Sequence, residues 1–289
     1  MHVPVLAKEA LEFLDVRPDG VYIDATLGSG GHAEAIVGRL ESGKVLAIDR
    51  DPAAITLARE RLGSSAGTLI AALGNFAEID AIHAATGLPL AAGVLADLGI
   101  SSGQLEDAAR GFSFGLPGPL DMRMDQDDAE TAADLVNRTG EHELADLIFQ
   151  LGEERHSRRI ARAIVRARPI RTTTELAQVV TRAIPARAGP RHLHPATRTF
   201  MALRMAVNHE LENLELFLQK ALSVLAPGGR VVVVSFHSLE DRRVKQAFRA
   251  WQDSGTARIL TRKPVRPGEE ELRANPRSRS AKLRAAEKA

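Results

Sequence analysis

The sequence predicts an α/β fold in which a doubly wound parallel sheet is interrupted by a helical insertion. Over roughly the first 100 residues, short apolar runs alternate with segments of helical pattern, which is typical of a parallel sheet. The alternation then stops, because residues 102–197 contain helical and loop patterns but no convincing strand. A later apolar run resumes the sheet, and two short strands with no helix between them follow it. The expected strands are residues 21–25, 45–48, 69–73, 93–98, 230–236, 259–262 and 281–286.

Helices are predicted from capping residues and from periodicity. Asp51-Pro52 supplies an N-cap residue and a proline at the first helical position, so a helix is expected from there to about residue 62. Apolar residues recur at three- and four-residue spacing over residues 199–225, which predicts one long helix ending before Pro227-Gly228-Gly229. Further helices are expected at 32–40, 141–151, 155–166, 173–183 and 239–251, and loops at 112–124 and 268–276.

A glycine turn follows the first predicted strand. Gly28, Gly30 and Gly31 precede a predicted helix, and the second strand ends in Asp49. This order of strand, glycine turn, helix, strand and acid binds adenosine-containing cofactors at the carboxyl ends of parallel strands. The glycines let the backbone approach the ligand, and the acid can accept both ribose hydroxyl protons.

The residues alone are consistent with two cofactors, a nicotinamide dinucleotide and S-adenosylmethionine. Gly28-x-Gly30-x-x-Ala33 also fits the fingerprint of dinucleotide sites, so an NAD-dependent dehydrogenase is an alternative. Asp24 within the first strand and His32 at the helix start favour S-adenosylmethionine. A carboxylate at Asp24 can reach a ligand's amino group, and dinucleotide sites usually keep small residues where His32 stands. The closing pair of strands without a helix is also more typical of methyltransferases than of dinucleotide folds.

The composition excludes several classes of protein. The chain has no cysteine, so disulfides, thiolate metal sites and cysteine nucleophiles are excluded, and with them methylation of pyrimidine carbon 5 through a cysteine adduct. No apolar run approaches the roughly 18 residues needed to span a bilayer. Residues 1–14 have an amphipathic pattern rather than that of a signal peptide. We therefore expect a cytoplasmic protein with no membrane partner.

The net charge of +1 conceals a strong asymmetry. Residues 1–150 carry 10 Lys and Arg against 24 Asp and Glu, whereas residues 151–289 carry 28 against 13. This split predicts a polyanionic partner for the second half, although two faces that attract each other within the fold are an alternative. The sequence leaves the oligomeric state open between a monomer and a homodimer.

Arginines concentrate in the predicted helix 155–166. They fall at i, i+3, i+4, i+7 and i+11, on one helix face, at Arg155, Arg158, Arg159, Arg162 and Arg166. No acid lies between Arg155 and Arg171, so ordinary ion pairing along the helix cannot explain them, and we expect phosphate contacts. A second basic cluster comprises Arg273, Arg277, Arg279, Lys282 and Arg284. His192-x-His194 fits a loop or an RNA contact better than a metal pair, and no metal site is predicted.

Asp97-Leu-Gly-Ile-Ser-Ser102 lies at the end of the fourth predicted strand, beside the glycine turn. The exocyclic amine of cytosine or adenine is a poor nucleophile, and acceptors for its hydrogens can aim its lone pair at a methyl group. Asp97 is the candidate acceptor; the alternative is that it caps the following turn. Phe76, at the end of the third strand, is placed either against an adenine or in the core.

Further motifs follow one another along the chain. They are His2-Val-Pro-Val-Leu6, Asp24-Ala-Thr-Leu-Gly-Ser-Gly-Gly-His32, Ala47-Ile-Asp-Arg-Asp-Pro52, Asp97-Leu-Gly-Ile-Ser-Ser102, Arg110-Gly-Phe-Ser-Phe114, Gly118-Pro-Leu-Asp-Met-Arg-Met124, Gly152-Glu-Glu-Arg155, Arg159-Ile-Ala-Arg-Ala-Ile164, His194-Pro-Ala-Thr-Arg-Thr-Phe200, Ser235-Phe-His-Ser-Leu-Glu-Asp-Arg242 and Asn275-Pro-Arg-Ser-Arg-Ser280. With these motifs the sequence resembles, nearly end to end, the RsmH (MraW) family of bacterial 16S rRNA cytosine-N4 methyltransferases.

The resemblance implies a class I S-adenosylmethionine methyltransferase, with a Rossmann-like sheet and closing hairpin. It implies methyl transfer to N4 of a cytidine, cytosine 1402 in the family's usual name, in 16S rRNA of the small ribosomal subunit. Residues 1–104 and 198–289 would form the methyltransferase domain, and residues 105–197 an inserted helical domain for substrate recognition. An amino-methyltransferase acting on DNA and a noncatalytic RNA-binding module are the competing interpretations.

The resemblance also assigns roles to residues. Those that would bind the cofactor are Gly30, Gly31, His32, Asp49, Phe76, Asp97 and Gln104. From the chemistry of the amine we expect Asp97, with Ser101 and Ser102 in the turn after it, to position the target amine in catalysis. Expected RNA contacts are Arg155, Arg158, Arg159, Arg162, His194, Arg198, His237 and Ser238, and the segment Phe236-His237-Ser238 is expected to line the base pocket. Gly103 departs from the family pattern, in which proline is common before the glutamine.

Overall fold

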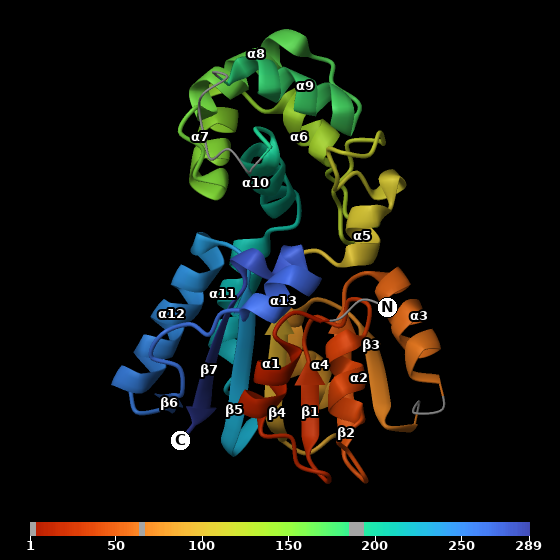
Figure 1. The fold of residues 1–289 in the computed structure, drawn as a ribbon, viewed down its shortest axis with the longest axis vertical. Coiled ribbons are helices and arrows are strands. Elements are labelled where there is room, and N and C mark those ends of the chain that lie inside the picture. The colour runs from red at the N-terminus through yellow and green to blue at the C-terminus, as the bar shows by residue number, and fades with distance from the viewer. Residues whose placement is uncertain (1–3, 64–66, 185–193) are drawn as a thin grey trace. The chain divides into compact units, whose positions relative to one another are not determined.

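The chain is described by a computed structural model that covers residues 4–63, 67–184 and 194–289 (Figure 1). It divides into two compact units. The first unit comprises Met1–Ile100 and Leu211–Ala289, and the second comprises Ser101–Glu210. The second unit begins at Ser101 rather than at the expected residue 105, and it ends at Glu210 rather than at residue 197.

A seven-stranded sheet of order β3-β2-β1-β4-β5-β7-β6 forms the first unit (Figure 1). Its strands are β1 Val21–Asp24, β2 Lys44–Asp49, β3 Leu69–Leu73, β4 Ala91–Asp97, β5 Leu225–Ser235, β6 Ala257–Ile259 and β7 Lys282–Lys288. The strands from β3 to β5 pair in parallel, and β7 pairs antiparallel with both β5 and β6. The doubly wound sheet and its closing antiparallel strands are therefore confirmed.

Helices cover both faces of this sheet, because side chains along each strand point alternately to opposite sides. Ile23 and Val94 lie in the core that includes α4 Ile79–Thr86, α11 Glu210–Lys220 and α12 Ser238–Asp253. Tyr22 and Leu95, one residue away on the same strands, lie in the core that includes α1 Ala7–Leu14, α2 Gly31–Val37 and α3 Pro52–Leu62. Burial on both faces explains why the central strands are continuous apolar runs.

The second unit is helical. It contains α5 Ser102–Glu106, α6 Ala132–Arg138, α7 Glu141–Gly152, α8 Ser157–Ala167, α9 Thr173–Ala183 and α10 Thr197–Val207. The expected loop at 112–124 is confirmed, and side chains hold it: the Arg110 guanidinium donates to the carbonyls of Arg123 and Met124. Within the described ranges of both units, no helix combines the length and the apolar character that a bilayer-spanning segment requires.

The prediction of one long helix over 199–225 is wrong. The helix α10 ends at Val207, His209 has a positive φ of 49°, and α11 begins at Glu210. The side chain of Asn208 donates to the carbonyls of Arg204 and Met122 and accepts from the amide of Met124, so it competes with continued helix. The strand β5 begins at Leu225, five residues before the predicted start, and includes the Pro227-Gly228-Gly229 segment.

Two further expectations need correction. The helix α8 begins at Ser157 and not at residue 155, because the Glu154 carboxylate accepts the amide of His156 in a turn before it. Arg155 therefore precedes the helix and is not part of its arginine face. The expected loop at 268–276 contains the helix α13 Glu269–Ala274, whose Glu271 carboxylate accepts the amide of Leu6. A helix therefore lies between β6 and β7, where none was expected.

Candidate functional site

Three aspartates end neighbouring parallel strands of the first unit. Asp24 ends β1, Asp49 ends β2 and Asp97 ends β4. Because the strand order places β1 between β2 and β4, these carboxyl ends lie along one edge of the sheet. Open α/β sheets bind their ligands outside this edge.

The glycine turn between β1 and α2 needs its glycines. Gly28 and Gly30 have φ values of 51° and 79°, in the left-handed region that disfavours other residues. A Cβ atom at Gly30 would lie 3.1 Å from the Cβ of Ala58. A side chain there would meet both backbone strain and a crowded neighbour, so the turn is fixed close to α3.

Asp49 holds this turn in place. Its Oδ2 accepts the amide of Gly28 at 2.7 Å, and its Oδ1 accepts the amide of Asp51 at 2.9 Å. Burial raises the pKa of Asp49 in spite of these two bonds. A carboxylate has about four lone-pair positions, so each oxygen can still accept a hydroxyl from a ligand.

Asp24, His32 and Asp97 form a buried cluster. Asp24 is fully buried; its Oδ1 accepts the amide of Thr26 at 3.2 Å. His32 is 5% exposed, and its Nε2 lies 3.4 Å from Oδ2 of Asp97. Asp97 is anchored through its amide, which donates to the Thr26 hydroxyl at 2.6 Å.

The electrostatics of this cluster are unusual for a protein interior. Burial raises the pKa of Asp24 to about 6. Burial alone would lower the pKa of His32, but the carboxylates of Asp97 and Asp24 outweigh it and raise that pKa. The cluster therefore favours a protonated His32 between two carboxyl groups.

Several polar atoms of this cluster have no hydrogen-bond partner among the residues that the structure describes. They are Asp24 Oδ2, Asp97 Oδ1 and both ring nitrogens of His32. Buried polar atoms are nearly always paired in folded proteins, and exceptions mark sites that a ligand or solvent completes. Acceptors at the end of two strands, beside a glycine turn, fit a ligand that carries an amino group or a positive charge.

Phe76 lies at the end of β3, where the segment Phe76–Glu78 forms a single 3-10 turn. Its ring is partly buried and packs on Phe217, with centroids 5.3 Å apart. The preceding Asn75 caps the turn by accepting the amide of Ala77, and it donates to Asn213. Phe76 therefore packs against the core beyond the end of β3, as one of the two expected placements has it, and its contact with an adenine stays a prediction.

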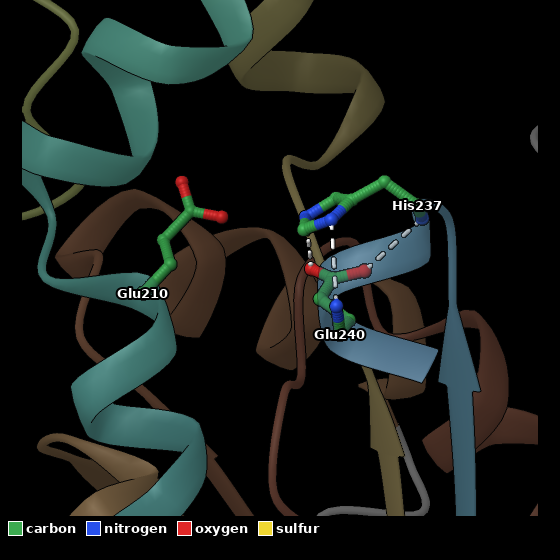
Figure 2. Close-up of side chains that lie close together, drawn as sticks. All are labelled: Glu210, His237 and Glu240. Carbon is green, nitrogen blue, oxygen red and sulfur yellow. Dashed lines mark hydrogen bonds and ion pairs between the residues drawn. The ribbon is translucent and has the colours of Figure 1, made fainter. Parts of the chain in front are cut away.

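His237 and Ser238 lie at the carboxyl end of β5, where α12 begins. Figure 2 shows the His237 ring over the carboxylate of Glu240, with Nε2 and Oε1 3.0 Å apart. The second oxygen, Oε2, accepts the amide of Phe236 at 2.9 Å. Glu240 is 3% exposed and completes a capping box with His237. Glu240 was not among the predicted site residues, although an acid three residues after an N-cap position is the sequence signal of such a box.

Ser101, Ser102 and Gln104 belong to the second unit, at the start of α5. The Ser101 hydroxyl accepts the amide of Gln104 at 3.2 Å, and the Gln104 side-chain oxygen accepts the amide of Ser101 at 3.1 Å. This capping box fixes both side chains. A Cβ atom at Gly103 would meet just the Ser101 hydroxyl, at 3.8 Å, so this position is not crowded. Glycine here, where proline is common in the family, therefore leaves the turn intact.

The arginines of α8 that the sequence predicts as RNA contacts are exposed. Arg158, Arg159 and Arg162 stand out from the helix while Ile160 and Ile164 are buried beneath it. Arg162 Nε lies 3.3 Å from the Glu141 carboxylate. Across the described part of the chain, Arg155, Arg158, Arg159 and Arg166 show no ion pair. The exposed arginine face is therefore largely free of internal counterions.

His194 and Arg198 stand near the start of α10. The His194 ring is exposed and stacks on Phe114, with centroids 4.5 Å apart and planes inclined by 16°. Its Nδ1 accepts the amide of Ala196, so the neutral ring carries its proton on Nε2. Arg198 donates to the Glu153 carbonyl at 3.2 Å. His192, the other half of the expected histidine pair, lies outside the described residues.

Comparisons with known proteins agree with one another. The model of a family described as the MraW methylase family matches residues 1–289. A relative from Syntrophobacter fumaroxidans, named Ribosomal RNA small subunit methyltransferase H, is 51% identical over 306 residues, covering 99% of this chain and 96% of its own. One of the same name from Solibacter usitatus is 53% identical over 287 residues, covering 99% of each chain. A crystal structure of a suggested rRNA methylase from Clostridium thermocellum is 11% identical, covers 100% of both chains and has a TM-score of 0.51, which supports the fold.

Proposed function

The chain belongs to the MraW methylase family, and on that premise we propose that it methylates the exocyclic N4 of a cytidine in 16S rRNA. It is a methyltransferase with the Rossmann-like fold of class I enzymes, and its cofactor is S-adenosylmethionine. The curated relatives are named for the RNA of the small ribosomal subunit. We place the activity where those subunits mature, in the cytoplasm.

The cluster of Asp24, His32 and Asp97 is the observation that carries the proposal. Its unpaired acceptors lie at the carboxyl ends of β1 and β4, beside the glycine turn. The two acids differ in access, since Asp24 is fully buried whereas the Asp97 side chain is 24% exposed. Asp24 would therefore contact the cofactor alone, whereas Asp97 would contact both the cofactor and the substrate.

The residues that would hold the cofactor surround this cluster. Asp49 would accept the ribose hydroxyls, Phe76 would lie against the adenine, and the backbone at Gly30 and Gly31 would allow close approach. The charges of Asp24 and Asp97 would stabilise its amino group and its sulfonium, which replaces solvation that burial removes. Gln104, at the start of α5, is the further residue that we propose as a cofactor contact. When bound, S-adenosylmethionine supplies an electrophilic methyl group on a positively charged sulfur.

Asp97 would orient the amine that receives the methyl group. Its Oδ1 is the unpaired oxygen, while Oδ2 lies 3.4 Å from His32. An acceptor for an amine hydrogen draws the lone pair of the nitrogen out of the ring's π system and points it along the line of transfer. No strong base is needed, because the nitrogen loses its proton readily once it is methylated. Ser101 and Ser102 would shape the turn that follows.

The target base has to leave its stack to reach this edge of the sheet. His237, held by Glu240, would present a flat ring to the base, with Ser238 beside it. Phosphates would contact the exposed arginine face of α8, where Arg158 and Arg159 have no ion pair among the described residues. His194, stacked on Phe114, is a second surface on which an unpaired base can stack.

The test is transfer of labelled methyl groups to small ribosomal subunits that lack the modification, followed by nucleoside analysis. We expect the label to appear as N4-methylcytidine at one position. Label in another nucleoside would overturn the assignment of the target atom. Cofactor binding without label in subunits or naked rRNA would overturn the RNA assignment, and DNA would then be tested as the substrate of the same amine chemistry.

A further inference from the structure

A basic cavity lies in the first unit, away from the carboxyl edge of the sheet. Its volume is about 730 Å³, and it is bounded by the second half of α12, by β6 with the residues that follow it, and by β7. Phe248 lines it and is 2% exposed. A cavity of this size matches the range in which small ligands or parts of polymers bind.

Three cations on two walls of the cavity make no ion pair with the residues that the structure describes. Lys245 and Arg249 are exposed at i and i+4 on α12, and Arg262 is exposed on the segment after β6. Within the described ranges none of the three has an ion pair, and Asp253 is the one acid among the lining residues. Like charges four residues apart on a helix repel each other, so this arrangement opposes stability unless an anion binds.

The buried cation among the lining residues, Arg284, shares its counterion with a second cation. Arg284 is 7% exposed, and its Nε donates to Asp241 at 2.6 Å. The same carboxylate also accepts Lys282 at 3.1 Å. Asp241 is partly buried, which would raise its pKa, but these two cations outweigh that effect and hold it below its usual value. The single negative charge of Asp241 therefore balances only one of the two positive charges of Arg284 and Lys282.

Arg258 at the rim follows the same pattern. Its guanidinium donates to Glu287 at 2.9 Å, and Glu287 also accepts Arg230 at 3.0 Å. Positive charge therefore exceeds negative charge on the walls of the cavity and among the ion pairs behind them. A concave wall of low dielectric concentrates such a field and raises the local concentration of anions.

We propose that this cavity binds the phosphate backbone of the rRNA substrate, a few nucleotides from the target cytidine. The proposal rests on the proposed function. The cavity residues of α12 lie 7 to 15 positions after Ser238, or roughly 10 to 22 Å along the helix. Phosphates of one strand are spaced by about 3.4 Å along a duplex axis, so about three to six nucleotides span that distance.

The experiment compares two triple variants of the full chain. Lys245→Gln, Arg249→Gln and Arg262→Gln together neutralise the cavity. Lys8→Gln, Arg39→Gln and Arg59→Gln together are the control, because these residues are exposed on the first unit and far from α12 in sequence. Binding to unmethylated small subunits is measured across salt concentrations, and cofactor affinity is measured alongside.

The expected result is a flatter salt dependence for the cavity variant. Each lost phosphate contact removes about 0.7 from the slope of log affinity against log salt for single strands, so the slope should fall by about 2 in the cavity variant and stay unchanged in the control. Cofactor affinity should be unchanged in both. A cavity variant with the slope of the unmodified protein would overturn the proposal.

This outcome is separable from failure of the proposed function. If the unmodified protein forms N4-methylcytidine but the cavity variant keeps its salt slope, the cavity inference fails and the function stands. If no methylated cytidine forms while the cavity variant still loses slope, the function fails and the anion site stands.

Trp251 stacks on Phe248 with centroids 4.9 Å apart, so its fluorescence reports whether the cavity is folded. Should the triple variant unfold, Lys245→Gln alone should reduce the slope by about 0.7.

Discussion

Replacing Asp24 by asparagine removes a carboxyl group that is fully buried beside His32 and Asp97. Burial moves the pKa of Asp24 from 3.8 to about 6 in the folded protein. At about 1.36 kcal/mol per unit of pKa, that difference corresponds to roughly 3 kcal/mol of destabilisation once the group is ionised. Between pH 3.8 and 6 the folded state binds the extra proton, so the free energy of unfolding falls as pH rises through this range.

The side chain of the Asp24→Asn variant cannot ionise, so the variant does not lose this part of the free energy of unfolding as pH rises. We expect the free energy of unfolding of the variant, relative to the unmodified protein, to increase by up to about 3 kcal/mol from pH 4 to pH 6.5. An amide that lacks a partner has a cost of its own, about 1–3 kcal/mol, but that cost does not vary with pH. The raised pKa of His32 acts in the same direction, but its contribution is lost above its ordinary value of 6.5, outside this window. Cofactor affinity should fall in the variant, because a neutral amide replaces the carboxylate charge proposed to face the amino group.

The assay is urea denaturation at several pH values, followed by fluorescence. The chain has one tryptophan, Trp251, which lies in the same unit as Asp24 and therefore reports on its unfolding. Asp19→Asn is the matched control, since Asp19 is exposed and its replacement should leave the curve unchanged. A stability difference between Asp24→Asn and the unmodified protein that is independent of pH would refute the reasoning.

Three further predictions concern the turns and the arginine face. Gly30→Ala should abolish cofactor binding and lower stability by about 1–2 kcal/mol, because φ is 79° and Ala58 lies 3.1 Å from the new Cβ; calorimetric titration with cofactor and a melting curve test this. Gly103→Ala should raise stability by about 0.4–1 kcal/mol without changing turnover, since its Cβ meets no close atom; a lower melting temperature would contradict it. Neutralising Arg158 and Arg162 with glutamine should reduce the salt slope of RNA binding by about 1.4, and an unchanged slope would argue against the arginine face.

Elements with strong local signals could be predicted from the sequence. The strand Leu69–Leu73 and the helix Pro52–Leu62 have the expected bounds. In the helix, Asp51 accepts the amide of Ala53, as an N-cap residue should. The break between α10 and α11 could not be predicted, because it depends on contacts of Asn208 with Met122 and Met124, more than 80 residues away. The leucine periodicity continues across the break, since each helix packs into a core of its own.

Part of the candidate site could also be predicted from the sequence. Acids at the ends of parallel strands meet at one edge, so Asp24, Asp49 and Asp97 could be grouped from the order of the strands alone. The unpaired state of Asp24 Oδ2 and the 3.4 Å separation of His32 and Asp97 depend on packing, which no sequence pattern reports. The basic cavity was not predictable either, because α12, β6 and β7 bring its walls together from separate segments.

The most direct test of the account is single-turnover methyl transfer by Asp97→Asn. Asparagine keeps the shape of the side chain but lacks the negative charge beside the target amine, and removing one such group typically costs about 100-fold or more in rate. With unmethylated small subunits as substrate, we predict a fall in rate of at least about 100-fold, with cofactor affinity reduced by less than about tenfold. A rate equal to that of the unmodified protein would contradict the central role given to Asp97.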